Sequence, residues 1–361
     1  MNKASVLFIL YTALFITMAC HSDSEKDVPV IKVRFSGQGI NTPFYMSQFI
    51  DSVQRITIPD DGVTIAQPSR LRYCRKQYYL VDAKDQTLYI LNENGNVVQT
   101  ICHRGRAENE YVSLADYDIN EINGEISIYD ESGNKMLVYA ENGRFIRSYK
   151  LNATLEVYRD FVVLNNGDYL SFTPDFNHDP EGERGFWLTD SLGNPKRQLD
   201  KMDEQYRYVQ YRLLGYFSKM SDGKIGFLGV EDKDVIYHIT PEGSPYIAYK
   251  LDYERKMSKK TLTTQLTPQS APSYAYMKYW YAETDNWIVI STISMNPAGH
   301  ALIFYDKNAD KEHLCVNDND LVDDMKAEVF GATAAVDRLV GIHYPDNSTI
   351  LNPEIVVAYL K

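Results

Sequence analysis

The sequence predicts an all-β protein built from one repeated sheet, and three observations support this prediction. First, a pattern of two apolar runs and an Asn-Gly pair is written twice: Tyr79–Asp82, Leu88–Leu91 and Asn94–Gly95, then Ser127–Asp130, Met136–Tyr139 and Asn142–Gly143. Second, Asn-Gly between alternating apolar runs is typical of a β-hairpin. Third, the turn recurs at Gly193 and Gly243, and a spacing of about 50 residues that carries only strands is typical of propeller blades.

The strands, taken in order, account for six blades. Two spare strands come first, at Val30–Phe35 and Val53–Ile58. The next units lie at residues 71–101, 117–151, 161–193, 224–251 and 287–306. The final strands, Leu339–His343 and Pro353–Leu360, form an incomplete sheet, so we expect one or more N-terminal strands to pair with it. This closes a six-bladed β-propeller over residues 30–361 and leaves only short, protected edges.

The N-terminal residues predict where the protein is located in the cell and are not expected to be part of the fold. In residues 1–19, Lys3 precedes a short apolar run that ends in small residues, as in a secretory signal peptide. Thr17–Cys20 resembles a bacterial lipobox, which implies that Cys20 becomes a lipidated first residue and tethers an otherwise water-exposed chain. The alternative is an ordinary signal peptide with a coincidental cysteine. Residues 20–29 are polar and acidic and predict a flexible spacer.

The composition narrows the classes of function. The 361 residues carry a formal charge of -12 without basic clusters, which makes nucleic acid a poor partner. Besides Cys20, the cysteines are an odd set, Cys74, Cys102 and Cys315, without the spacing of a metal site. Cys74 and Cys102 could pair, but small buried thiols are the simpler interpretation. The seven histidines are scattered, so we expect neither a metal nor a cofactor.

The chain as a whole resembles the six-bladed β-propeller lipoproteins of Bacteroidetes, which are related in pattern to NHL and TolB-like propellers. The signal segment with Cys20, the blade pattern D-x5-L-x-I/V-x4-G and the ending Asn352–Lys361 carry this resemblance. The family also has a G-[RK]-G-P-G-E-Y loop between its first two blades, of which Gly105–Tyr111 keeps the first two and last two positions. The resemblance implies an outer-membrane lipoprotein, on the cell surface or the periplasmic face, with no established ligand.

That loop contains the densest charged group on a predicted inter-blade connection: Arg104, Arg106, Glu108 and Glu110. An arginine here could clamp a carboxylate or an acidic sugar while Glu110 orients it. The alternative is structural: Arg106 and Glu110 pair with each other and pin the loop, and Tyr111 packs as a wedge between blades. Arg104, Arg106, Glu110 and Tyr111 are therefore candidate ligand-binding residues.

Aspartates recur at strand ends, at Asp82, Asp130, Asp190 and Asp306. A ring of carboxylates could bind a metal in the channel. Their position just before turns favours hairpin caps instead, since an Asp side chain bonds readily to backbone N–H groups two or three residues on. We expect the structural role.

An aromatic run, Tyr274 to Trp287, lies in residues 252–286, which interrupt the repeat. Long insertions between blades form loops on one face, and exposed flat side chains on a loop suit stacking on sugar rings. Tyr279, Trp280 and Tyr281 are the second set of candidate ligand-binding residues. Burial of these rings would contradict this interpretation.

These observations favour a non-catalytic, lipid-anchored binding module of the cell envelope, for a glycan, a peptide or a partner protein. The membrane is contacted only through the lipid. The alternative is an envelope hydrolase or lyase with its site at the channel mouth. No GxSxG elbow and no other catalytic motif occurs in the sequence, so no catalytic residue is assigned.

Overall fold

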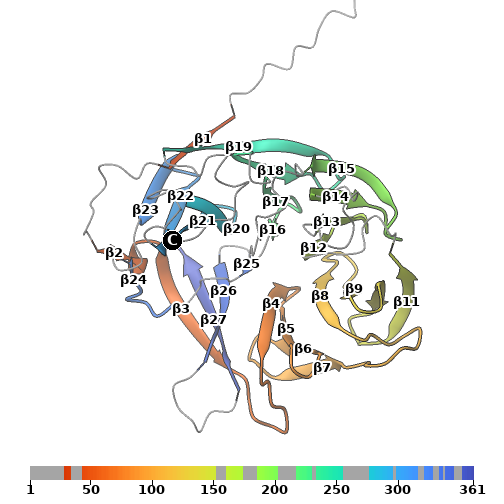
Figure 1. The fold of residues 1–361 in the computed structure, drawn as a ribbon. Helices are drawn as coiled ribbons and strands as arrows, with labels where there is room; N and C mark the ends of the chain where they lie inside the picture. Colours follow the sequence, from red (N-terminus) through yellow and green to blue (C-terminus); the bar gives the residue numbers. More distant parts are fainter. Residues whose placement is uncertain are drawn as a thin grey trace, which may run out of the picture.

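The computed structural model describes residues 28–33, 43–151, 160–173, 185–201, 217–229, 233–254, 276–295, 298–315, 321–327, 333–335, 338–344 and 352–361. Their strands form six sheets arranged around a central axis, with the first strand of most blades innermost (Figure 1). The predicted six-bladed β-propeller is confirmed. Within these ranges, no helix is long and apolar enough to cross a membrane.

Five blades follow the chain order, each as a four-stranded antiparallel meander. Blade one is β4 (Pro68–Cys74), β5 (Gln77–Asp82), β6 (Thr87–Asn92) and β7 (Val97–Ile101); blade two is β8 (Leu114–Ile119), β9 (Ile126–Asp130), β10 (Lys135–Tyr139) and β11 (Phe145–Lys150). Blade three is β12 (Asp160–Val163), β13 (Tyr169–Thr173), β14 (Gly185–Thr189) and β15 (Pro195–Lys201). Blade four is β16 (Phe217–Lys219), β17 (Ile225–Leu228), β18 (Val235–Ile239) and β19 (Pro245–Tyr253). Blade five is β20 (Tyr276–Glu283), β21 (Trp287–Met295), β22 (Ala298–Asp306) and β23 (Lys311–Cys315).

Blade six joins the two ends of the chain. It consists of β25 (Thr333–Ala335), β26 (Arg338–His343) and β27 (Glu354–Leu360), completed by the N-terminal β3 (Ile50–Thr57) as the outer strand. The antiparallel register runs from Thr57 opposite Glu354 to Ile50 opposite Leu360. The predicted closure by an N-terminal strand is confirmed.

The other N-terminal strand takes no part in this closure. β1 (Val30–Val33) pairs in parallel with β19, as a fifth strand on the outer edge of blade four. Its alternating burial explains this position, since Ile31 and Val33 are buried in the layer between blades four and five while Val30 is exposed. A further short pair, β2 (Phe44–Tyr45) with β24 (Leu321–Val322), and a 3-10 turn at Met46–Gln48 lead into β3.

Apolar layers between neighbouring blades form the core. The layer between blades one and two contains Tyr79, Leu88 and Ile90 on one side and Tyr117, Ile128 and Leu137 on the other. Both faces of a blade are covered in this way, which is why middle strands such as β9 are buried at every position. Packing of this kind places the inner strands around the axis and holds their polar residues there.

The outermost turns of the first four blades repeat one conformation. Gly95, Gly143, Gly193 and Gly243 have positive φ, and each donates its N–H to the carbonyl three residues earlier. Glycine is the residue that adopts positive φ without strain. The glycine that recurs about every 50 residues is therefore required by the positive φ of the turn.

Candidate functional site

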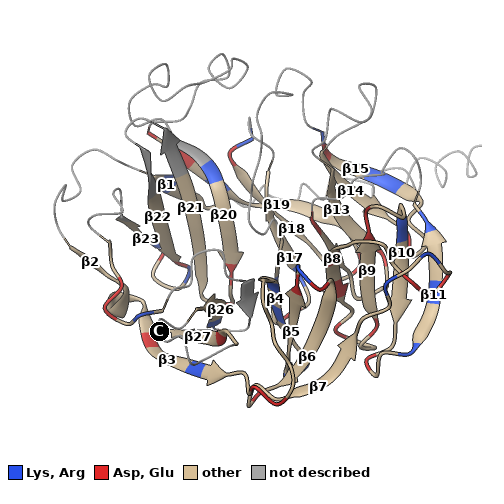
Figure 2. Cartoon of the chain, turned by 60° about the horizontal axis from the view of Figure 1, so that its bottom comes forward, with Lys and Arg blue, Asp and Glu red and all other residues tan. Residues whose placement is uncertain are grey.

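Charged side chains from four inner strands meet at the centre of the ring. Residues two apart on a strand share a face, so Arg70 and Arg72 of β4 lie together, as do Asp116 and Asp118 of β8. Figure 2 shows these blue and red segments around the axis. We call Arg70, Arg72, Asp116, Asp118, Asp160 and Lys219 the central cluster.

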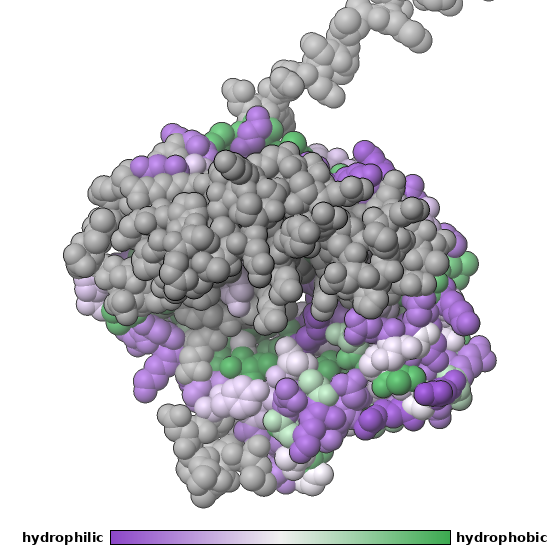
Figure 3. Space-filling view, viewed as in Figure 1, coloured by the Kyte–Doolittle hydropathy of each residue, from purple (hydrophilic) through white to green (hydrophobic). Residues whose placement is uncertain are grey.

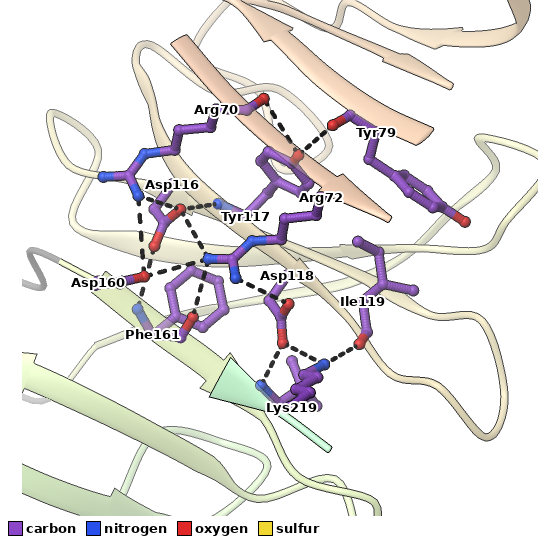
Figure 4. Close-up of polar contacts among 11 residues, drawn as sticks. Arg70, Arg72, Tyr79, Asp116, Tyr117, Asp118, Ile119, Asp160, Phe161 and Lys219 are labelled. Atoms are coloured by element: carbon purple, nitrogen blue, oxygen red, sulfur yellow. Dashed lines mark hydrogen bonds and ion pairs between the residues drawn. The ribbon is translucent and has the colours of Figure 1, made fainter. Parts of the chain in front are cut away.

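Arg72 is the hub of the central cluster (Figure 4). Its guanidinium lies 3.2 Å from Asp160 of blade three and 3.6 Å from both Asp116 and Asp118 of blade two. Arg70 adds a contact of 3.1 Å to Asp116. From blade four, Lys219 donates to Asp118 at 2.8 Å and to the carbonyl of Ile119 at 2.6 Å. Four blades are therefore joined by charge.

The two aspartates of β8 also bind the edge of the next blade. Asp116 accepts the backbone N–H of Phe161 at 3.1 Å, and Asp118 accepts that of Val163 at 2.6 Å. The unpaired edge of β12 presents alternate N–H groups, and carboxylates two residues apart match that spacing. Both aspartates thus have a structural function that occupies part of their oxygen atoms.

Burial and neighbouring charges shift the pKa values in the cluster. Burial opposes the charge of Arg72, but the three surrounding carboxylates outweigh it and raise the pKa of the guanidinium. Burial also raises the pKa of Asp116, to about 7, with Arg70 opposing the shift and the neighbouring Asp160 adding to it. A carboxyl of this kind remains largely protonated in mildly acidic solution.

A cavity of about 240 Å³ opens beside the central cluster, at the C-terminal ends of the inner strands. We call it the central pocket. Its charged lining residues are Arg72, Arg75, Lys219, Arg338, Asp118 and Glu121. Asp116 and Asp160 lie behind this wall rather than in it.

Arg338 differs from the other cations of the central pocket. Arg72 and Lys219 contact carboxylates of the central cluster, and Arg75 lies 3.4 Å from Glu141. The guanidinium of Arg338 instead stacks over the Tyr73 ring, 4.1 Å from its centroid, and its buried Nε has no hydrogen-bond partner. Among the described residues, no carboxylate pairs with it. Arg338 therefore contributes a positive charge that has no direct carboxylate partner among the described residues, in a pocket that Glu121 also lines.

A second cavity, of about 630 Å³, lies between blades four and five, and we call it the groove. On its wall, His238 Nε2 donates to Glu283 at 2.9 Å, while Nδ1 lies 3.3 Å from the hydroxyl of Tyr246. Glu283 also contacts Lys307 at 2.6 Å and accepts the hydroxyl of Tyr281. Burial opposes ionisation of Glu283, but His238 and Lys307 outweigh it and lower the pKa of the carboxyl.

Comparison with known proteins places this geometry in a family. A family model described as a domain of unknown function, DUF4934, matches residues 29–351. The chain belongs to the DUF4934 family. No curated protein sequence is detectably similar to this member.

Two solved structures share the fold of this DUF4934 protein. A putative exported protein from Bacteroides fragilis has a TM-score of 0.67 at 14% sequence identity, over 92% of this chain and 99% of that chain. A member of the DUF4221 family from Bacteroides vulgatus has a TM-score of 0.53 at 11% identity, over 86% and 97% of the two chains. The two TM-scores support the resemblance to propellers of Bacteroidetes at the level of the fold.

The predicted loop of the DUF4934 protein is held by hydrogen bonds, but its contacts differ from those expected. Ala107 N–H donates to Glu110 at 2.9 Å, and Lys135 of blade two donates to the carbonyl of Ala107 at 2.9 Å. No ion pair joins Arg106 to Glu110, which are both in the described chain. Arg104 and Arg106 are exposed. The loop precedes β8, so it lies at the opposite ends of the inner strands from the central pocket, and the prediction that it binds a ligand remains untested.

Tyr111 fulfils the structural role expected of it. The side chain is fully buried among residues of blades one and two. Its hydroxyl donates to the carbonyl of Gln86 at 2.6 Å and lies 3.0 Å from that of Ile101. Tyr111 is a wedge between blades, and in this structure it has no access to a ligand.

The second set of candidate residues requires a correction. Tyr279, Trp280 and Tyr281 lie on β20, the inner strand of blade five, rather than on an exposed loop. Trp280 and Tyr281 are each only 2% exposed and pack into the layers toward blades six and four, respectively. An inner strand is buried on both faces, which produces an aromatic run that resembles a binding loop. The expectation that these rings are exposed for stacking is wrong.

The recurrent aspartates cap turns, as expected. Asp306 accepts the N–H groups of Asn308 and Ala309, and Asp190 accepts those of Leu192 and Asn194. Asp82 and Asp130 also accept N–H groups from the segments that lead into β4 and β8.

Cys74 and Cys102 are free thiols, and burial raises the pKa of Cys74 to about 12; Cys102 is exposed, contrary to expectation. Cys20 and residues 1–27 lie outside the described residues.

The sequence reasoning missed the central cluster and Arg338. Two signals were present: Arg-Leu-Arg in β4 and Asp-Tyr-Asp in β8 place like charges on one face of a predicted strand. In a blade whose middle strands are apolar, alternate charges on the innermost strand indicate a polar channel. Arg338 carries no such pattern.

Proposed function

We propose that this DUF4934 protein is a non-catalytic binding module of the cell envelope, held by a lipid on Cys20 at the outer membrane. Its central pocket binds the anionic group of a ligand. The observation that supports this most directly is Arg338, a cation that lines the pocket and has no carboxylate partner among the described residues. An arginine presents a planar fork that matches a carboxylate.

The ligand group in this pocket is small. A cavity of about 240 Å³ is smaller than the usual drug-sized site, so it accepts one end unit of a larger molecule. Hydrophilic residues prevail on the described surface in Figure 3, with apolar residues among them. The central pocket is itself lined by six charged residues, which suits a polar ligand better than an apolar one.

The enzymatic alternative, an envelope hydrolase or lyase, has one observation in its favour. Burial raises the pKa of Asp116, which lies beside Asp160, to about 7. Both side chains are buried, and neither lines the central pocket. A general acid must reach its substrate, so the geometry favours binding over catalysis.

Calorimetric titration of the chain from Val28 to Lys361, which contains every described blade, tests the proposal. We expect glucuronic acid to bind and glucose, which lacks the carboxylate, not to bind. Arg338→Gln should weaken binding about tenfold or more, because it removes a charge-assisted contact. Arg338→Lys should restore part of the affinity, and Arg197→Gln, at an exposed arginine of blade three, is the matched control.

Equal binding of the acid and the neutral sugar would contradict the proposal. So would an Arg338→Gln variant that melts like the wild type and binds glucuronic acid unchanged. Turnover of the bound acid or of a linked sugar would favour the enzymatic alternative.

A further inference from the structure

The central pocket and the groove are neighbours on one face of the ring. Both are lined by Met220 and Ser221, which lie in the turn between β16 and β17. The two cavities are therefore separated by a single β-turn rather than by a blade. The groove is the larger, at about 630 Å³ against about 240 Å³. A ligand whose end unit fills the pocket would enter the groove next.

The charges of the two cavities differ. In the groove, the lysines have acidic partners: Lys307 contacts Glu283, and Lys224 contacts Asp222. Asp285 accepts the hydroxyl of Ser221. The central pocket retains the unpaired charge of Arg338. One site therefore matches an anionic unit, and the other matches uncharged units with hydroxyl groups.

The groove also has an aromatic surface in a fixed orientation. Tyr246 is 41% exposed and lies edge-to-face with His238, with ring centroids 5.6 Å apart. His238 is itself only 6% exposed and is held by Glu283 from behind. An exposed flat ring beside fixed polar groups is the arrangement that stacks on one face of a sugar and bonds its hydroxyls.

We propose that the central pocket and the groove form one continuous site for an oligosaccharide with an acidic end unit. The acidic unit contacts Arg338, and neutral units cross the β16–β17 turn at Ser221 and lie against Tyr246. This assignment rests on the proposed function of the central pocket. We favour a sugar because the exposed ring of Tyr246 lies beside the fixed polar side chain of His238. Peptides commonly add to a strand edge, and β1 covers the edge of β19 only from Lys250 to Tyr253, so a peptide is the alternative ligand in the test below.

The experiment compares ligands of two lengths on the same chain from Val28 to Lys361. The probes are glucuronic acid and aldotetrauronic acid, in which one glucuronic unit is linked to three xylose units. We expect the longer acid to bind about tenfold more tightly. Tyr246→Ala should remove this difference and leave the affinity for glucuronic acid unchanged. Tyr45→Ala, at a residue of β2 that is 42% exposed and outside both cavities, is the control.

Three results would overturn the inference in distinguishable ways. If both acids bind equally, the groove takes no part, although the proposed function of the pocket stands. If neither acid binds, the proposed function itself fails. If acetylated tetra-alanine with a free carboxyl terminus binds more tightly than the aldotetrauronic acid, and its amide does not, the ligand is a peptide.

Discussion

At the scale of single residues, Arg72 compensates the negative charge of the aspartates that are buried inside the ring. It faces three aspartates from two other blades, and its own charge is stabilised by them. Removing one partner of a buried charge network leaves the others uncompensated and destabilises the fold by several kcal/mol in typical proteins. Arg338, by contrast, makes no ion pair with these aspartates among the described residues, so it can be replaced without disturbing this network.

Asp116 makes the stability of the protein depend on pH. Its pKa in the folded state, about 7, lies above the ordinary aspartate pKa of 3.8. A raised carboxyl pKa contributes stability that is fully present below about pH 4 and is lost as the pH rises through about 7. We expect Asp116→Asn to flatten this decline, with each pKa unit worth about 1.4 kcal/mol.

Urea unfolding at pH 5 and pH 8 measures this effect. The wild type should lose more stability than Asp116→Asn between the two values, whereas Asp61→Asn, at an exposed residue, should follow the wild type. An identical loss in wild type and Asp116→Asn would show that the Asp116 carboxyl is ionised throughout.

At the scale of strands and turns, how well the sequence predicted a strand depended on whether one face or both faces of that strand are buried. The outer hairpins were predicted correctly because the Asn-Gly pairs at residues 94–95 and 142–143 specify a turn on their own. The role of β20 was predicted wrongly because a strand buried on both faces has no alternation, so that Tyr279, Trp280 and Tyr281 form one aromatic run in the sequence. Which of the N-terminal strands closes the ring was not predicted, since a strand pattern does not identify its partner; β3 does so, and β1 joins blade four.

Two glycines with positive φ allow the cost of backbone strain to be measured separately from the cost of a steric clash. A methyl group on Gly95 would lie 2.5 Å from the carbonyl oxygen of Thr57 in blade six, whereas one on Gly62 would meet nothing within 4 Å. We expect Gly62→Ala to lower the free energy of unfolding by about 1 kcal/mol through strain alone. Gly95→Ala should cost a further 1 to 3 kcal/mol, roughly, through the clash. Chemical denaturation of both variants tests this. Equal losses of unfolding free energy would mean that blade six moves away from the added methyl group on Gly95 at little cost.

At the scale of the whole molecule, the ring explains why the site could not be read from the sequence. The central pocket takes residues from β4, β8, β12, β16 and β26, which lie up to 266 positions apart, from Arg72 to Arg338, and meet only when the blades close. A repeat in the sequence predicts that blades surround an axis. It does not predict which side chains remain unpaired there, because that depends on the exact rotation of each blade.

Ring closure depends on a polar contact as well as on strand pairing. Asn352, only 2% exposed, precedes β27 and bonds the segment that leads from β3 to blade one. Its side chain accepts the N–H of Ile65 at 2.8 Å and donates to the carbonyls of Pro59 and Val63 at 3.1 and 2.9 Å. The side chain thus holds the C-terminal strands of blade six against the entry to blade one.

We expect Asn352→Ala to lower the free energy of unfolding by up to about 3 kcal/mol, because three backbone groups lose a bond worth about 1 kcal/mol each. Asn94→Ala, at an exposed turn residue, should change it by less than about 0.5 kcal/mol. Thermal melts and hydrogen exchange of both variants provide the measurement. If blade six is essential to the ring, exchange in Asn352→Ala should increase first in β3 and β27, and later in blades two to four. Uniform exchange throughout the ring would show instead that the closure is no weaker than the other blade contacts.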